Sequence, residues 1–144
     1  MEEAIVKAIS TLEGAAKDPD MDLIDYYLLH KNIDNHRYIA RVITRVDACG
    51  PVIVDCTDAL ESIIGYSRES VNGTCLSDYM PDGVDMKRVV SFASHVENEN
   101  GGVKSNTVIH RDGSEVRVTG ILFPIGNGYF YEIVWRDSNE QSIS

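Results

Sequence analysis

Two glycine turns near the end of the chain constrain its fold more than any other feature. Asp112-Gly113 and Asn127-Gly128 are dipeptides that tolerate the positive φ angles of tight hairpin turns. They separate three stretches rich in β-branched and aromatic residues, residues 103–111, 115–125 and 129–136. Strand-like stretches joined by such turns predict three consecutive antiparallel strands.

An earlier strand pair and a helical insert complete the predicted domain. Residues 38–46 alternate in a strand-like pattern, and residues 52–54 form a short second strand. A short helix is expected from Thr57, brief helical turns over residues 65–81, and an amphipathic helix within residues 82–97. Two strands before the insert and three after it predict an α+β fold, a five-stranded antiparallel sheet with helices on one face.

The first 36 residues predict an N-terminal helical extension. Residues 2–12 place four apolar side chains on one stripe of a helix, and a second helix is plausible over residues 22–31. The members of this N-terminal stripe are Ile5, Ala8, Ile9 and Leu12. The stripe must be covered, either by the outer face of its own sheet or by a second subunit.

The strand over residues 115–125 indicates what the N-terminal stripe covers. Apolar residues occur on both of its faces toward its end, and Ile121 and Phe123 share one face. A sheet with one wetted face would stay polar on that side throughout. We therefore predict a homodimer whose interface combines the N-terminal stripe with Ile121 and Phe123.

Charge and length exclude several classes of function. A chain of 144 residues is the size of one domain. The formal net charge is −10 and no lysine or arginine cluster occurs, so we expect no nucleic-acid partner. No long apolar run and no basic leader is present, which predicts a cytoplasmic protein without a membrane partner.

The cysteines Cys49, Cys56 and Cys75 lack CxxC spacing and are expected to be reduced.

Three motifs resemble the PAS family of sensory domains. Residues 57–73 resemble the hallmark of that family, a short helix that ends in Gly65-Tyr66-Ser67 and a turn that ends in Gly73. Arg111-Asp112-Gly113-Ser114 is similar to its hairpin motif, and Trp135-Arg136-Asp137 to its final strand. The resemblance implies a PAS domain over residues 37–137, with residues 138–144 as a polar tail.

The resemblance implies a sensory or adaptor role. The sequence contains no phosphate loop, GxSxG elbow or HExxH motif, so we expect binding and not catalysis. Only seven residues follow Asp137, which leaves no room for an output domain and implies a signalling partner in trans. An unrelated cone-shaped α+β binding protein or enzyme is the alternative fold.

A second hypothesis is a ligand pocket between the sheet and the helices. The alternative is a core that the same side chains fill completely. Its candidate lining comes from the long helix and from the strand that follows: Val89, Phe92, Ala93, Val96, Val103, Ser105, Thr107 and Ile109.

The cofactor stays unknown, and the sequence favours none. Haem is the alternative, because His95 lies in the helix from which haem-binding PAS members take an axial ligand. Flavin is disfavoured, because Cys75 comes one residue earlier than the reactive cysteine of the family's GxNCRFLQ motif, and the asparagine, arginine and glutamine of that motif are missing. We expect Cys75 to be a buried apolar side chain. No metal ligands are predicted.

Overall fold

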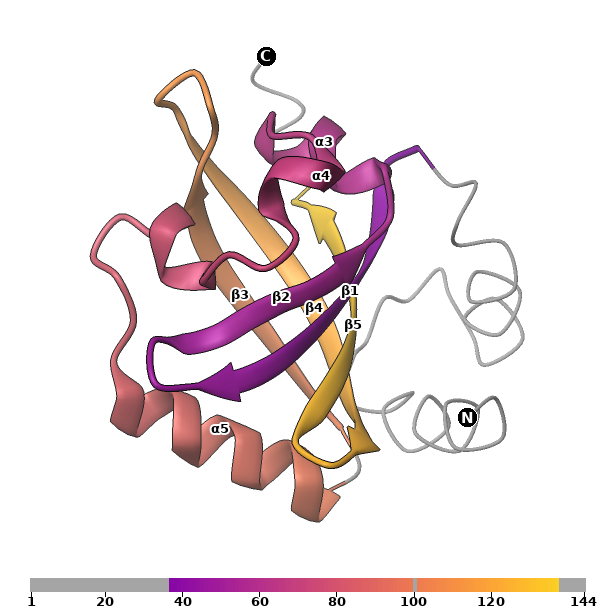
Figure 1. Cartoon of the computed structure of the whole chain (residues 1–144), viewed down its shortest axis with the longest axis vertical. Helices are drawn as coiled ribbons and strands as arrows, with labels where there is room; N and C mark the ends of the chain where they lie inside the picture. Colours follow the sequence, from indigo (N-terminus) through magenta and orange to yellow (C-terminus); the bar gives the residue numbers. More distant parts are fainter. Residues whose placement is uncertain (1–36, 100, 138–144) are drawn as a thin grey trace.

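The computed structural model describes residues 37–99 and 101–137, which form one five-stranded antiparallel sheet and four helices (Figure 1). The strands are β1 (Ile39–Asp47), β2 (Gly50–Cys56), β3 (Gly102–Ile109), β4 (Glu115–Gly126) and β5 (Tyr129–Arg136). They lie in the order β2-β1-β5-β4-β3, with every neighbouring pair antiparallel. The last strand thus lies at the centre of the sheet, and the helical insert joins the two edge strands.

The predicted hairpin turns explain the pairing of the last three strands. Gly113 has a φ of 91° and Asn127 a φ of 57°, the left-handed geometry that tight turns require. The register pairs Ile121 with Ile133 across β4 and β5. The strands predicted over residues 103–111, 115–125 and 129–136 are therefore confirmed, with ends that differ by one or two residues.

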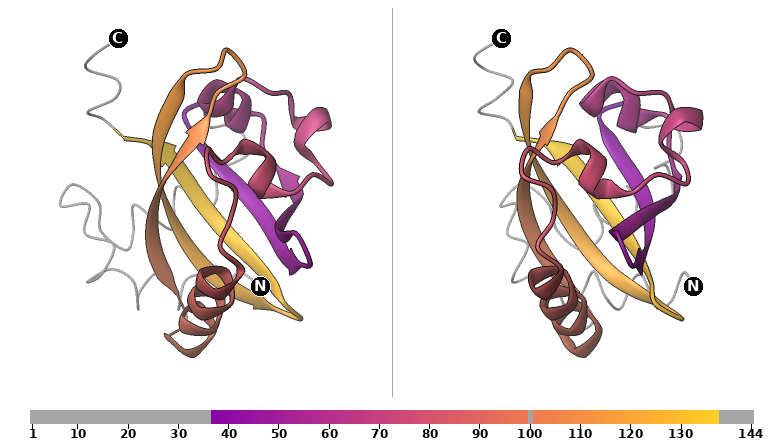
Figure 2. Two further views of the ribbon diagram at one scale, coloured as in Figure 1. Left: turned by 90° about the vertical axis from the view of Figure 1, so that its left-hand side faces the viewer. Right: turned by 60° about the vertical axis from the view of Figure 1, so that its left-hand side comes forward.

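The helical insert lies on one face of the sheet, as predicted. It consists of α3 (Ala59–Ile64), α4 (Arg68–Val71), the 3-10 helix η2 (Leu76–Tyr79) and α5 (Met86–Glu99). Figure 2 shows all four on the same side, with α5 packed near the ends of β3 and β4. The predicted N-terminal helices, the interface residues Ile5, Ala8, Ile9 and Leu12, and the polar tail lie outside the described residues.

The main core lies between α3 and the inner face of the sheet. It buries Leu60, Ile63 and Ile64 of α3. The facing strand residues are Ala40, Val42, Val108, Val116, Val118 and Val134, each at most 7% exposed. This apolar layer fixes the distance between helices and sheet and so shapes the space beside it.

The outer face of the sheet also buries large side chains. Ile121, Phe123, Tyr131 and Ile133 are each at most 2% exposed, and the rings of Phe123 and Tyr131 stack with centroids 5.0 Å apart. We call these four residues the outer patch. The four described helices lie on the opposite face (Figure 2). The prediction that the sheet is buried on both faces is confirmed.

Two of the sequence motifs contact each other in space. Gly65 ends α3 with a φ of 81°, and a side chain there would collide with the ring of His110. The backbone N–H of Arg111 donates to the carbonyl of Ile64 at 2.9 Å. The Gly65-Tyr66-Ser67 turn and the Arg111-Asp112-Gly113 hairpin therefore form one structural unit.

The prediction of three reduced cysteines is wrong in this structure. A disulfide joins Cys49 to Cys75, whereas Cys56 is free and buried. The segment after Gly73 runs beside β2, where Val52 bridges to Cys75, and this brings the two cysteines together. Cys75 is half-buried and not a buried apolar side chain, and spacing along the sequence carries no signal of that proximity.

Candidate ligand-binding cavity

A cavity of about 50 Å³ lies between the inner face of the sheet and the short helices. Its roof comes from α3 and η2, and its floor from all five strands. The roof residues are Leu60, Ile63, Ile64, Leu76 and Tyr79, with Met80 beside them. The floor residues are Val42, Thr44, Ile53, Lys104, Asn106, Val108, Val118, Glu132 and Val134. The lining is apolar except for a few polar side chains on the floor, a composition typical of small-molecule sites.

A second cavity of about 50 Å³ lies beneath α5. Four residues of α5 line it, together with eight from the strands and η2. These are Val89, Phe92, Ala93 and Val96, and then Thr44, Val46, Pro51, Leu76, Lys104, Leu122, Phe130 and Glu132. Thr44, Leu76, Lys104 and Glu132 line both cavities, so they form the wall that the two share.

A wider groove of about 400 Å³ adjoins both cavities. Leu76 and Lys104 line all three spaces. The groove also includes Asp82, Asp85 and Arg88, which are exposed, so it reaches the surface at the N-terminal end of α5. Leu76 and Lys104 are therefore the side chains at which all three spaces meet.

The structure places half of the predicted pocket residues on the cavity. Val89, Phe92, Ala93 and Val96 of α5 line the second cavity. The four predicted residues of β3, Val103, Ser105, Thr107 and Ile109, lie on the opposite face of the sheet, because their neighbours Lys104, Asn106 and Val108 line the first cavity. That half of the prediction is wrong by one residue of register.

Polarity explains this error and the residues that the sequence interpretation missed. Lys104 and Asn106 alternate with the β3 residues that were predicted to line the pocket, so the prediction put them on the other face of the sheet. Here they lie on the cavity floor with Thr44 and Glu132. Glu132 stands between apolar residues on both sides, Tyr129-Phe130-Tyr131 and Ile133-Val134-Trp135, and a lone acid in such a strand was the available signal.

Glu132 is the most deeply buried charged residue of the cavity. Its side chain is 8% exposed, and burial raises its pKa above the ordinary glutamate value, against the lowering effect of Lys104. Among the described residues, none is seen to form a hydrogen bond or ion pair with its carboxyl group. The carboxyl group of Glu132 thus faces the space of the cavity.

The structure does not place the haem candidate His95 on the cavities. His95 is exposed on α5, where its ring stacks on Phe92 with centroids 6.2 Å apart, and it lines none of the three spaces described above. Neither cavity approaches the several hundred Å³ of a site for a large cofactor. Within residues 37–99 and 101–137, no group of three histidine, cysteine or acidic residues could hold a metal ion.

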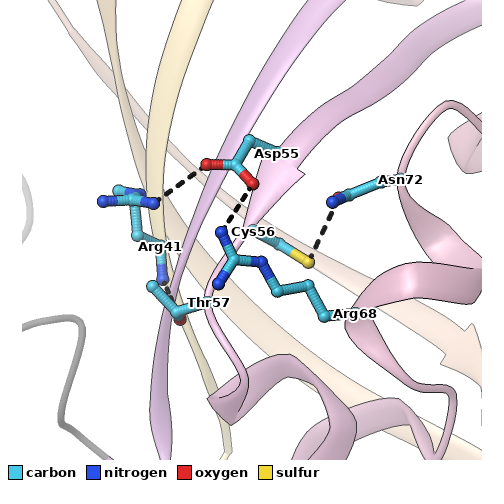
Figure 3. A network of polar contacts seen from close by, with 6 residues as sticks. All are labelled: Arg41, Asp55, Cys56, Thr57, Arg68 and Asn72. Atoms are coloured by element: carbon cyan, nitrogen blue, oxygen red, sulfur yellow. Dashed lines mark hydrogen bonds and ion pairs between the residues drawn. The ribbon is translucent and has the colours of Figure 1, made fainter.

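A polar network outside the cavities anchors the start of the helical insert (Figure 3). The carboxylate of Asp55 accepts hydrogen bonds from Arg41 at 3.1 Å and from Arg68 at 3.0 Å, which joins β1, β2 and α4. Partial burial would raise the pKa of Asp55, but the two arginines, Arg68 above all, hold it below its ordinary value. The network is therefore a structural connection between sheet edge and helices.

Cys56 lies beside this network and its thiol is 3.5 Å from the side-chain oxygen of Asn72 (Figure 3). Burial raises the pKa of the thiol to about 11, with the neighbouring Asp55 adding to the effect. The side chain therefore stays a neutral thiol near neutral pH, which fits a structural role.

Strand order, helical insert and the cavity between sheet and helices together define the PAS fold. The search of solved structures supports this: a PAS domain from Colwellia psychrerythraea is 22% identical, with a TM-score of 0.62 over 79% of this chain and 98% of that one. No protein-family model and no curated protein matches the chain.

Two further similar structures come from regulatory proteins. One is the PAS domain, in complex with ethanol, of a transcriptional regulator in the LuxR family from Burkholderia thailandensis, 14% identical with a TM-score of 0.62 over 76% and 96% of the two chains. The other is the LOV domain of a blue-light activated histidine kinase from Erythrobacter litoralis, 20% identical with a TM-score of 0.54 over 68% and 94%. At these identities the comparisons establish the fold.

No helix in the described part of the chain is long and apolar enough to cross a membrane.

Proposed function

We propose that this protein is a PAS-type sensory module that binds a small molecule between its sheet and its helices and acts by protein contact, without catalysis. The observation that supports this proposal is the pair of adjoining cavities, lined by apolar side chains and divided by Thr44, Leu76, Lys104 and Glu132. A core selected only for stability would fill this space and would place no charged residues beside it.

The size of the cavities favours a small ligand. Each is about 50 Å³, enough for a few atoms, and together they suit a molecule much smaller than haem or flavin. The ethanol complex of the similar LuxR-family domain supports occupation of this fold by a molecule of that size.

Native mass spectrometry of freshly purified protein tests ligand binding. We expect a mass excess that disappears when the same sample is denatured. Repeated absence of any bound molecule, after expression in several media and with haem supplied, would instead favour a packed scaffold. A Soret band in the purified protein would favour the haem alternative.

Homodimerisation through the outer patch is the second part of the proposal. Its support is in the sequence, where the N-terminal stripe of Ile5, Ala8, Ile9 and Leu12 and the apolar residues Ile121 and Phe123 both need apolar cover. A signalling protein would then be contacted in trans, and the acidic charge argues against nucleic acid as that partner.

The location we propose is the cytoplasm, with one observation against it. Disulfides such as Cys49–Cys75 persist in oxidising compartments and are rare in a reducing cytosol. The redox state of this pair in cells, measured by thiol alkylation of rapidly quenched lysate, tests the proposal.

A further inference from the structure

One acidic residue lies on the wall between the two cavities. Glu132 lies on β5 at the wall that divides the two cavities, and its side chain is 92% buried, being 8% exposed. Among the described residues, none donates a hydrogen bond to its carboxyl group or pairs with it. Its oxygens are not among the fully buried atoms that lack a partner, so they touch the cavity space, where a donor group of a ligand can reach them.

Gly120 makes room for this carboxyl group. It lies on the neighbouring strand β4, where Leu122 pairs with Glu132, and any side chain at position 120 would overlap the Glu132 carboxyl group. A glycine inside a strand often marks a place where another group approaches closely. The strand pair therefore holds the carboxyl group against the cavity floor, in contact with the cavity.

Lys104 lines the same two cavities from β3 and does not neutralise Glu132. No ion pair joins the two side chains in the described structure, and the ammonium of Lys104 lies 5.8 Å from the centre of the Phe92 ring. The aromatic face attracts the lysine toward α5. The negative group is thus fixed and buried, whereas the positive one sits on a flexible stem toward the groove.

We propose that the cavity binds a small primary amine in its protonated form, with the ammonium hydrogen-bonded to Glu132 and a short apolar chain against Leu76, Val134 and α3. This inference rests on the proposed ligand-binding function and names the class of its ligand. An ammonium group supplies three donors to a carboxylate that has none, and the apolar walls accept the alkyl chain.

Amine binding is coupled to a proton. Burial favours the neutral form of Glu132, and a bound cation favours the ionised form, so binding releases a proton and tightens as pH rises. The other ionisable groups that line these two cavities are Lys104 from β3 and Tyr79 from η2, whose hydroxyl bonds to Thr74. The lining residues from β1, β2, β4, α3 and α5 carry no ionisable side chain.

Three probes of equal chain length test the inference: n-butylamine, n-butanol and butyrate. Each is titrated into the full chain while amide NMR shifts of Gly120, Lys104 and Leu76 are followed. We expect n-butylamine to bind at least tenfold more tightly than n-butanol, and butyrate most weakly. Equal affinity of amine and alcohol, or preferential binding of butyrate, would overturn the inference.

Two variants separate the carboxyl group from the rest of the cavity. Glu132→Gln should weaken n-butylamine at least tenfold and leave n-butanol binding unchanged, which also shows that the cavity is intact. Glu115→Gln removes the same charge from an exposed position at the start of β4 and should change neither affinity. Unchanged amine affinity in Glu132→Gln would refute the assignment.

The same titration distinguishes the inference from the proposal beneath it. If n-butanol binds as tightly as n-butylamine, the amine inference is refuted, whereas the proposed ligand-binding function still stands. Failure of all three probes to shift any cavity resonance, combined with an empty native mass spectrum, removes both.

Discussion

Gly65 shows how a single residue couples two motifs that lie 46 positions apart in sequence numbering, at Gly65 and Arg111. Its left-handed φ of 81° ends α3, and its missing side chain leaves room for His110. Gly73 has a similar φ of 85°, but nothing lies within 4 Å of the position a side chain would take. A comparison of substitutions at Gly65 and Gly73 therefore separates the cost of the left-handed backbone from the cost of the packing collision.

Gly65→Ala should cost about 2–3 kcal/mol of unfolding free energy, and Gly73→Ala about 1 kcal/mol. Both changes carry the penalty of a left-handed φ, but only the first also forces His110 to move. Urea unfolding followed by circular dichroism measures both. Equal losses in the two variants would show that His110 does not pack against Gly65.

Glu132 should make stability depend on pH in the direction opposite to most acids. Because its pKa is raised in the folded state, unfolding releases a proton once the pH exceeds the ordinary glutamate value of about 4.3. The contribution of Glu132 to the free energy of unfolding is therefore fully present below about pH 4.3, the ordinary glutamate pKa. It is lost as the pH rises from there through the raised pKa of the folded state.

Glu132→Gln should remove that loss and stabilise the ligand-free protein at pH 7 by about 1–3 kcal/mol, with little effect at pH 4. Thermal unfolding at both pH values is the measurement, and Glu115→Gln serves as the exposed control. A variant that is less stable than the parent at pH 7 would mean that the carboxylate is already compensated.

At the scale of elements, the strands were predictable and the contacts of the short helices were not. Period-two patterns and the Asp112-Gly113 and Asn127-Gly128 turns were sufficient for β3, β4 and β5. The inward face of β3 was predicted wrongly because Lys104 and Asn106 face the cavity, so polarity gave the inverted register. A pattern of hydrophobicity identifies a core face but not the floor of a polar site.

The disulfide is the element-scale feature that no pattern revealed. It fastens the turn between β1 and β2 to the residue that precedes η2, and Leu76, the first residue of η2, lines all three cavity spaces. The covalent link therefore restrains part of the cavity roof.

Cys75→Ser should lower the free energy of unfolding by about 3 kcal/mol, since the disulfide closes a loop with a sequence separation of 26. Reductant should lower the stability of the parent to that of the variant and leave the variant unchanged. Cys56→Ala is the control, because Cys56 is free and its variant should keep the response to reductant. A parent protein indifferent to reductant would contradict the disulfide.

At the scale of the whole molecule, the sequence predicted an α+β fold with a five-stranded sheet and helices on one face, and the structure confirms that arrangement in the described residues. The PAS resemblance rested on residues 57–73 and on Arg111-Asp112-Gly113, and the contact between Gly65 and His110 explains why the motifs occur together. The cavity was predicted only in part, because its floor depends on Glu132 and Gly120 from different strands being neighbours. Such pairing is a property of the fold and not of either segment.

The outer patch leads to a prediction about assembly. Light scattering should give the mass of a dimer, and the double change Ile5→Asp and Ile9→Asp should give a monomer, because charge on the N-terminal stripe prevents apolar burial. Ser10→Asp, off the stripe, should leave the dimer intact. A dimer that survives the double change would place the interface elsewhere.

The central claim is that the carboxyl group of Glu132 is buried beside a cavity that we propose binds an amine, and NMR titration of the glutamate side-chain carbons measures its ionisation directly. One resonance, missing from Glu132→Gln, should titrate above the ordinary glutamate range of about 4.3, and n-butylamine should lower its midpoint. If every glutamate titrates in the ordinary range and no midpoint responds to the amine, the account is contradicted.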